Sequence, residues 1–200
     1  MKKHIAKLTS GVFNPFLVSL VIIILISFEA TTSVSDAVKW SLILTAISIL
    51  PVFAVILYLA HKEKLEGIFI NIRQQRNIIY LLASICMAVG CIIILHLGAP
   101  SVLIAAFVAG LSAILVFMSI NLVWKISIHT AFAAASVTVL TILYGSIGAI
   151  TAMLLPPIAW ARIELEHHSL AQTVAGALLA ALIVVVVFHF FGIIGSSTPL

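Results

Sequence analysis

The pentapeptide Tyr144-Gly145-Ser146-Ile147-Gly148 interrupts an apolar stretch that runs from Thr130 to Trp160, and it decides how often the chain crosses a membrane. Without a turn there, one helix from Thr130 to Leu155 is long enough to cross alone, since ~20 apolar residues span a hydrocarbon core. With a turn, two helices of only ~22 Å each run in opposite directions, as a tilted or incomplete hairpin. The charges of the loops decide between these alternatives.

A turn at Gly145 places almost all basic residues on one side of the membrane. Only Lys39 then lies on the opposite side. The positive-inside rule assigns the basic side to the cytoplasm. The assignment is unchanged when basic residues with a candidate chemical role are set aside, which leaves Lys2, Lys3, Lys7, Lys62 and Lys64. The sequence therefore favours seven passes over six, with the first apolar helix retained rather than cleaved as a signal peptide.

The composition is that of a polytopic membrane protein. Of 200 residues, 64% are hydrophobic and 8% are charged, against about 25% charged residues in soluble domains, and the mean hydropathy is +1.33. We expect an all-α transmembrane helix bundle of about six to seven helices, forming one integral domain over residues 1–200 with its core at about 60–194. The apolar stretches run from about 12–28, 40–60, 78–97, 102–123, 130–144, 147–160 and 171–194.

The net charge of +4 does not indicate nucleic-acid binding, because no basic run contains interleaved aromatic residues. Charged side chains inside a bilayer are costly, and they are retained mainly at interfaces and functional sites. Three polar stretches are expected at the cytoplasmic face, each next to a helix start: residues 71–77, 125–129 and 162–172. Helix N-termini that carry Arg and Lys are suited to binding phosphate.

Several side chains in the first two stretches are candidate phosphate ligands. Arg73 and Arg76 are three residues apart and share a helical face, where they either bind phosphate oxygens or anchor to lipid headgroups. Lys125 is open to the same two interpretations. Ser127 precedes a helix, so its hydroxyl caps that helix or contacts phosphate, and His129 follows it as either a site residue or an interfacial group.

The third stretch holds the strongest candidates for chemistry. His168 and Gln172 are four residues apart, so the Gln172 carbonyl can accept a hydrogen bond from one ring nitrogen and leave the other as a nucleophile or base. His167 points about 100° away and competes for this role. Arg162 precedes His168 by six residues and meets it only if the intervening loop bends. Glu164 and Glu166 balance local positive charge, with a carboxylate–histidine metal site as the alternative.

The order and spacing of these residues resemble the three motifs of the type 2 phosphatidic acid phosphatase superfamily. Arg162, His168 and Gln172 are similar to the third motif, Ser127-Ile128-His129 to the second, and the segment Arg73–Asn77 occupies the place of the first. The resemblance covers roughly residues 60–180. It implies hydrolysis of a lipid phosphate through a phosphohistidine, with no metal and no other cofactor.

By this resemblance, His168 attacks phosphorus and His129 protonates the leaving alkoxide. The phosphoryl oxygens are then held by positively charged or hydroxyl side chains: Arg73, Arg76, Lys125, Ser127 and Arg162. Positioning and spread positive charge are what phosphoryl transfer chiefly needs. The implied substrate is a polyprenyl or prenyl phosphate or a phosphatidate-like glycerolipid. We expect the protein in the cell membrane, and the positive-inside rule predicts that the site faces the cytoplasm.

The chain departs from the family pattern at four positions. Gln172 stands in place of an aspartate, Ile128 of a glycine, Ile126 of a proline and Ala161 of a serine. No lysine stands seven residues before either arginine of the first motif. A glutamine can orient an imidazole but cannot stabilise its charged form as an aspartate does. The alternative function is therefore a catalytically inactive relative that binds anionic lipid or serves as a membrane scaffold.

Overall fold

The computed structural model describes residues 1–62 and 73–194, and every regular element in these ranges is a helix. This confirms the expected all-α class. Lys64, Asn71 and Ile72, which belong to predicted topological or polar segments, lie outside the described residues. The chain forms two compact units, one made of Met1–Ile22 with Ile126–Leu200 and the other of Ile23–Lys125.

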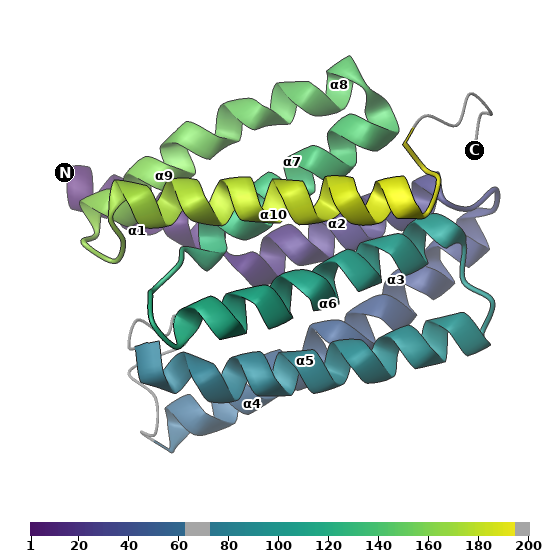
Figure 1. The fold of residues 1–200 in the computed structure, drawn as a ribbon, viewed down its shortest axis with the longest axis horizontal. Coiled ribbons are helices and arrows are strands. Elements are labelled where there is room, and N and C mark those ends of the chain that lie inside the picture. The colour runs from purple at the N-terminus through teal and green to yellow at the C-terminus, as the bar shows by residue number, and fades with distance from the viewer. Residues whose placement is uncertain (63–72, 195–200) are drawn as a thin grey trace. The chain divides into compact units, whose positions relative to one another are not determined.

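The first unit contains two long parallel helices and a returning helical arm. Figure 1 shows α7 and α10 side by side and running in the same direction, and α8, the 3₁₀ segment η1 and α9 lead the chain back from the end of α7 to the start of α10. Helix α9 also packs against α1. The elements are α1 (Lys2–Val12), the start of α2 (Pro15–Glu29), α7 (Ile128–Tyr144), α8 (Ser146–Ala149), η1 (Ile150–Leu154), α9 (Leu155–Glu164) and α10 (Leu170–Phe190).

The predicted turn at Gly145 is confirmed, and two glycines make it possible. Helix α7 ends at Tyr144, and Gly145 follows with φ of 60°, a left-handed conformation that glycine adopts without steric cost. A Cβ at Gly148 would overlap the backbone carbonyl of Leu140. The chain can therefore fold back closely onto α7 only because residue 148 is a glycine and has no side chain.

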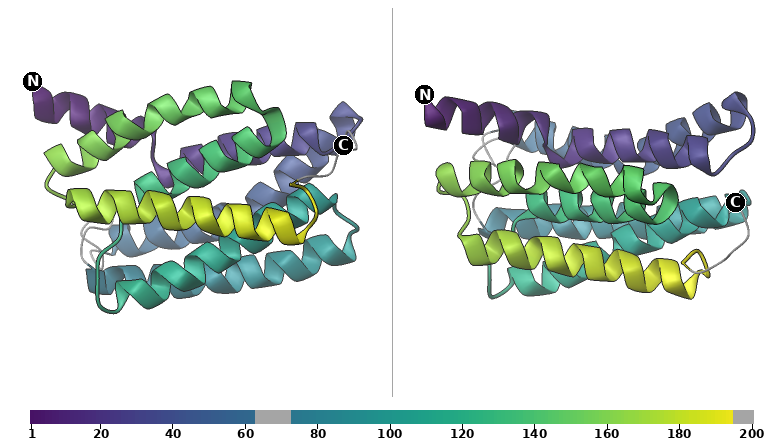
Figure 2. Two further views of the ribbon diagram at one scale, coloured as in Figure 1. Left: turned by 45° about the horizontal axis from the view of Figure 1, so that its top comes forward. Right: turned by 90° about the horizontal axis from the view of Figure 1, so that it is seen from above.

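The second unit is a set of antiparallel helices. Figure 2 shows α5 and α6 lying alongside each other, joined by a short connection. At their contact with α3, a Cβ on Gly90 would lie 2.7 Å from Ile47 Cγ2 and 2.8 Å from Phe107 Cε1. Glycine therefore sets how closely these three helices pack. The elements are the end of α2, α3 (Val34–Ser48), α4 (Leu50–His61), α5 (Arg73–His96) and α6 (Ser101–Asn121).

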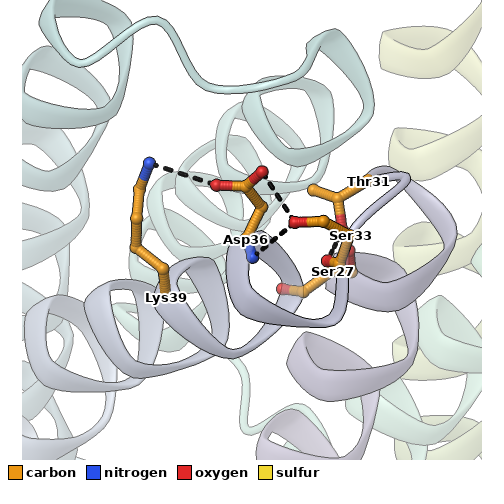
Figure 3. A network of polar contacts seen from close by, with 5 residues as sticks. All are labelled: Ser27, Thr31, Ser33, Asp36 and Lys39. Atoms are coloured by element: carbon orange, nitrogen blue, oxygen red, sulfur yellow. Dashed lines mark hydrogen bonds and ion pairs between the residues drawn. The ribbon is translucent and has the colours of Figure 1, made fainter.

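Polar side chains organise the turn between α2 and α3 (Figure 3). Ser33 is the N-cap of α3, where its hydroxyl accepts a hydrogen bond from the Asp36 N–H at 3.0 Å and donates to Asp36 Oδ2 at 2.8 Å. Asp36 also pairs with Lys39 at 3.6 Å. Thr31 donates to the carbonyl of Ser27 at 2.8 Å. These contacts satisfy backbone groups that are left open where one helix ends and the next begins.

The described helices identify an integral membrane protein. Five helical runs are long and apolar enough to cross a bilayer, and α1 with α2 makes a sixth if this pair, bent by 40°, is counted as one span. Helix α7 is apolar but, at 17 residues, shorter than a usual span. The five runs are Val34–His61, Arg73–His96, Ser101–Asn121, Ser146–Glu164 and Leu170–Phe190.

The reversal at Gly145 predicts that the two ends of the α8–α9 arm are reached from opposite sides of the membrane. Single cysteines at Ile147 and Leu170, which are 75% and 64% exposed, should react with an impermeant maleimide from opposite sides. The background carries Cys86→Ala and Cys91→Ala, so that neither native thiol reacts. Labelling of both positions from the same side would contradict two passes between residues 128 and 164.

Candidate functional site

The starts of α7 and α10 are joined by direct hydrogen bonds. The Ser127 N–H donates to the backbone carbonyl of Gln172 at 3.2 Å, and Thr130 Oγ1 donates to the backbone carbonyl of Thr173 at 3.0 Å. A Cβ added to Gly176 would lie 2.7 Å from the Ser127 carbonyl oxygen, so the backbones meet where α10 has no side chain. Two helix N-termini are therefore held together at the same end of the first unit.

Serine caps both helix starts, as the sequence indicated for Ser127. The Ser127 hydroxyl is fully buried and accepts a hydrogen bond from the Thr130 N–H. Ser169 caps α10 by accepting from the Gln172 N–H at 3.3 Å, while Gln172 Oε1 accepts from the Ser169 N–H at 3.2 Å. This reciprocal capping box fixes the Gln172 side chain. Its carbonyl oxygen is therefore held in a defined place.

The predicted contact between His168 and Gln172 is present. His168 Nδ1 lies 3.1 Å from Gln172 Oε1. The Ser169 N–H, which can only donate, bonds to this same atom, so the atom is the amide oxygen and can only accept. His168 Nδ1 therefore carries the hydrogen, and in the neutral ring Nε2 holds the lone pair. Gln172 thus selects the tautomer of His168 rather than that of His167.

Both candidate histidines are nearly buried at the joined helix starts. His129 is 6% exposed and is the second residue of α7, next to the Thr130 that bonds to α10. His168 is 8% exposed and directly precedes the N-cap of α10. An ionisable group is costly to bury in apolar surroundings unless polar groups compensate it. These two side chains are therefore candidates for function rather than for packing.

The loop between α9 and α10 bends as the prediction for Arg162 required. The Arg162 carbonyl accepts from the N–H groups of both His167 and His168, at 3.2 and 3.3 Å. Glu166 has φ of 58°, a conformation that non-glycine residues seldom adopt. The bend keeps the backbones of Arg162 and His168 in contact although five residues separate them in the sequence.

The Arg162 side chain is 3% exposed, and its Nη1 donates to Ser10 Oγ on α1 at 2.6 Å. The neighbouring Glu166 pairs with Lys3, also on α1, at 3.1 Å. This pair agrees with the expectation that Glu166 balances positive charge. Both of its side chains are largely exposed, so the pair contributes little to stability. Helix α1 thus contacts both the buried arginine and the loop before His168.

Arg73 of the second unit is bonded to the end of a helix. Its Nη1 donates to the carbonyl of Leu122 at 2.7 Å, directly after α6. Asn121 Nδ2 donates to the Arg73 carbonyl at 3.0 Å and to Asn77 Oδ1 at 2.7 Å. A cation at a helix C-terminus is electrostatically favourable. The guanidinium therefore ties the start of α5 to the end of α6, a role that the sequence did not indicate.

Arg76 and Lys125 also belong to the second unit. The Arg76 guanidinium lies 5.8 Å from the ring centroid of Tyr80, and the residue is 4% exposed. Such a cation–π contact stabilises an arginine that is withdrawn from water. Lys125 is half-buried. Phosphate binding by Arg73, Arg76 and Lys125 stays a prediction.

An apolar cavity of about 210 Å³ lies beside the joined helix starts, between α7, α9 and α10. Thr130 and Thr173 line it, and they follow His129 and Gln172 directly in the sequence. Both threonine hydroxyls are bonded to backbone carbonyls. The remaining lining is apolar: Leu155, Pro156, Ala159, Val174, Ala177 and Leu178.

Several residues that build this region could not be found from the sequence. Thr130, Thr173 and Gly176 are small residues in apolar helices, Ser10 is a small residue in the basic helix α1, and nothing in their spacing marks them. Asn14 is different: its Oδ1 accepts from the N–H groups of Phe16 and Leu17 at 3.0 Å each. An asparagine followed by a proline is a typical helix start, and it could have separated α1 from α2.

Comparison of the chain with protein-family models, with curated proteins and with solved structures finds no match.

The close contact at Gly176 predicts a strong effect of one methyl group. Gly176→Ala should lower the free energy of unfolding by about 1–3 kcal/mol, because the Ser127 carbonyl and Thr130 must move away. Gly11→Ala is the matched control, since a Cβ there meets no atom within 4 Å, and it should leave stability unchanged or raise it slightly. Unfolding of the detergent-solubilised protein measures both. Equal stability of the two variants would contradict the packing described for α7 and α10.

Proposed function

We propose that this membrane protein is a lipid phosphatase that uses His168 as its nucleophile. The observation that carries the proposal is a pair of contacts at Gln172. Its side-chain oxygen accepts a hydrogen bond from His168 Nδ1, and its backbone carbonyl accepts one from the Ser127 N–H. One residue thus orients an imidazole and joins the two helix starts that flank it. The resemblance to type 2 phosphatidic acid phosphatases supplies the reaction.

In the proposed reaction, His168 Nε2 attacks phosphorus and the ester P–O bond breaks. His129 donates a proton to the leaving alkoxide, which departs as an alcohol. Water then attacks the phosphohistidine, the P–N bond breaks, and His129 takes up the proton released from that water. Backbone N–H groups at the two helix starts, the Ser127 hydroxyl and Arg162 would stabilise the phosphoryl oxygens.

The apolar cavity supports a lipid substrate rather than a water-soluble phosphate ester. Its lining includes the residues that directly follow His129 and Gln172, and the rest of the lining consists of apolar side chains of α9 and α10. A phosphate held at the helix starts would leave its hydrocarbon chain at the mouth of this cavity. A hydrocarbon chain gains free energy by leaving water for such a surface. A polyprenyl or prenyl phosphate, or a phosphatidate-like glycerolipid, meets these requirements.

Histidine substitutions test the reaction. His168→Ala should reduce phosphate release from prenyl phosphate or phosphatidate to the uncatalysed level, because no nucleophile remains. His129→Ala should lower kcat by about 10²–10⁴-fold, the usual contribution of a general acid. His189→Ala is the matched control, because His189 is an exposed histidine in the last turn of α10, and it should retain wild-type activity.

Phosphate release that both site variants preserve would overturn the proposed roles. A wild-type protein that binds these lipids but releases no phosphate would instead favour the inactive, lipid-binding relative. In that role the Gln172 side chain would serve only to cap α10.

Filling the cavity tests the place of the lipid chain. Ala177→Leu adds a bulky side chain to the cavity lining and should raise KM several-fold for a long-chain lipid phosphate, while leaving KM for a short, water-soluble ester unchanged. Ala175→Leu is the matched control, because Ala175 lies on the same helix but does not line the cavity. An equal effect of Ala177→Leu on long and short substrates would exclude the cavity as the chain-binding site.

A further inference from the structure

Helix α1 presents one face to the protein and another to its surroundings. Ala6 and Ser10 are buried, 0% and 6% exposed, on the side that packs against α9. Ile5, Leu8 and Val12 are 48%, 65% and 53% exposed. At 100° per residue these three side chains form one stripe on the face opposite Ala6 and Ser10. We call them the α1 stripe.

Positive charge flanks the α1 stripe. Lys2 and Lys7 are exposed, and by the same rotation they lie on either side of it. Helix α1 contains no acidic residue. An apolar stripe bordered by lysines is typical of helices that lie at the boundary between acyl chains and headgroups, where lysine favours anionic lipid.

The position of α1 in the chain supports a lipid partner. Only Phe13 and Asn14 separate it from α2, whose axis is bent by 40° from that of α1. Helix α2 is apolar from Phe16 to Phe28 apart from two serines, and it ends at Glu29. Helix α1 is therefore the basic, N-terminal end of a bent pair that is long and apolar enough to cross a membrane only as a whole, and the end of such a pair lies at a charged headgroup layer.

We propose that α1 is a binding surface for anionic phospholipid. The α1 stripe contacts the upper parts of the acyl chains, and Lys2 and Lys7 contact the headgroup phosphates. A lipid bound there also acts on the proposed phosphatase site, because Ser10 on the inner face accepts the hydrogen bond from Arg162. Ser10 is thus a positioning residue for Arg162. This second effect rests on the proposed function, whereas lipid binding does not.

Lipid titration of the full-length protein tests the binding surface directly. A fluorophore sensitive to its environment is attached at His4→Cys, an exposed position on α1, in the Cys86→Ala and Cys91→Ala background. In neutral detergent, dioctanoyl phosphatidylglycerol should change the fluorescence saturably. Dioctanoyl phosphatidylcholine and inorganic phosphate should not, and added NaCl should weaken the response.

Paired charge variants locate the response. Lys2→Gln with Lys7→Gln should raise the half-saturating concentration of phosphatidylglycerol at least about fivefold, since each lysine near an anionic surface is worth up to about that factor. Lys39→Gln with Lys62→Gln removes the same charge from exposed positions of the second unit. This pair should change the half-saturating concentration less than twofold. Equal effects of the two pairs, or an equal response to phosphatidylcholine, would overturn the proposal.

Activity measurements test the link to Arg162. Phosphatidylglycerol should lower KM for the lipid phosphate in the wild type. Ser10→Ala should abolish this effect while leaving the fluorescence titration unchanged, and Ser10→Thr, which keeps the hydroxyl, should restore it. A Ser10→Ala variant that still responds to phosphatidylglycerol would overturn the link. A wild type that shows the fluorescence response without phosphate release would refute the proposed phosphatase and leave the lipid surface standing.

Discussion

The hydrogen bonds between the starts of α7 and α10 hold the candidate site together. The Ser127 N–H reaches the Gln172 carbonyl, and the Thr130 hydroxyl reaches the Thr173 carbonyl. Both bonds depend on the missing side chain at Gly176, where an added Cβ would lie 2.7 Å from the Ser127 oxygen. In an apolar medium, unsatisfied backbone groups cost several kcal/mol each. Joining the two helix starts gives the Ser127 N–H a hydrogen-bond partner. It also brings His129 and His168 to the same end of the unit.

Buried polar groups of the first unit gather around the starts of α7 and α10, at the end of α9 and on the inner face of α1. His129, Arg162 and His168 are each less than 9% exposed, and the capping box on α10 and Ser10 on α1 supply polar contacts there. Gln172 caps a helix and selects a histidine tautomer with one oxygen atom. A neutral amide oxygen thus serves both contacts at the start of α10.

The second unit shows that a basic residue in the right place in the sequence can also be structural. Arg73 and Arg76 share a helical face, as the spacing indicated, yet their surroundings differ. Arg73 bonds to the carbonyl that follows α6, and Arg76 lies over the ring of Tyr80. Both contacts would exist in a protein without any phosphate site. Spacing alone therefore cannot separate a ligand-binding arginine from one that closes a helix end.

The sequence by itself determined the all-α membrane class, the turn at Gly145, the cap at Ser127 and the pairing of His168 with Gln172. These features follow from hydrophobic length and from contacts within a few residues, which helix geometry fixes. Only the tertiary structure decided that Ser10 meets Arg162, that Arg73 meets Leu122, and that α7 and α10 join at Gly176. Such contacts link residues far apart in the chain, and they depend on how closely helices pack, which small residues in an apolar sequence do not reveal.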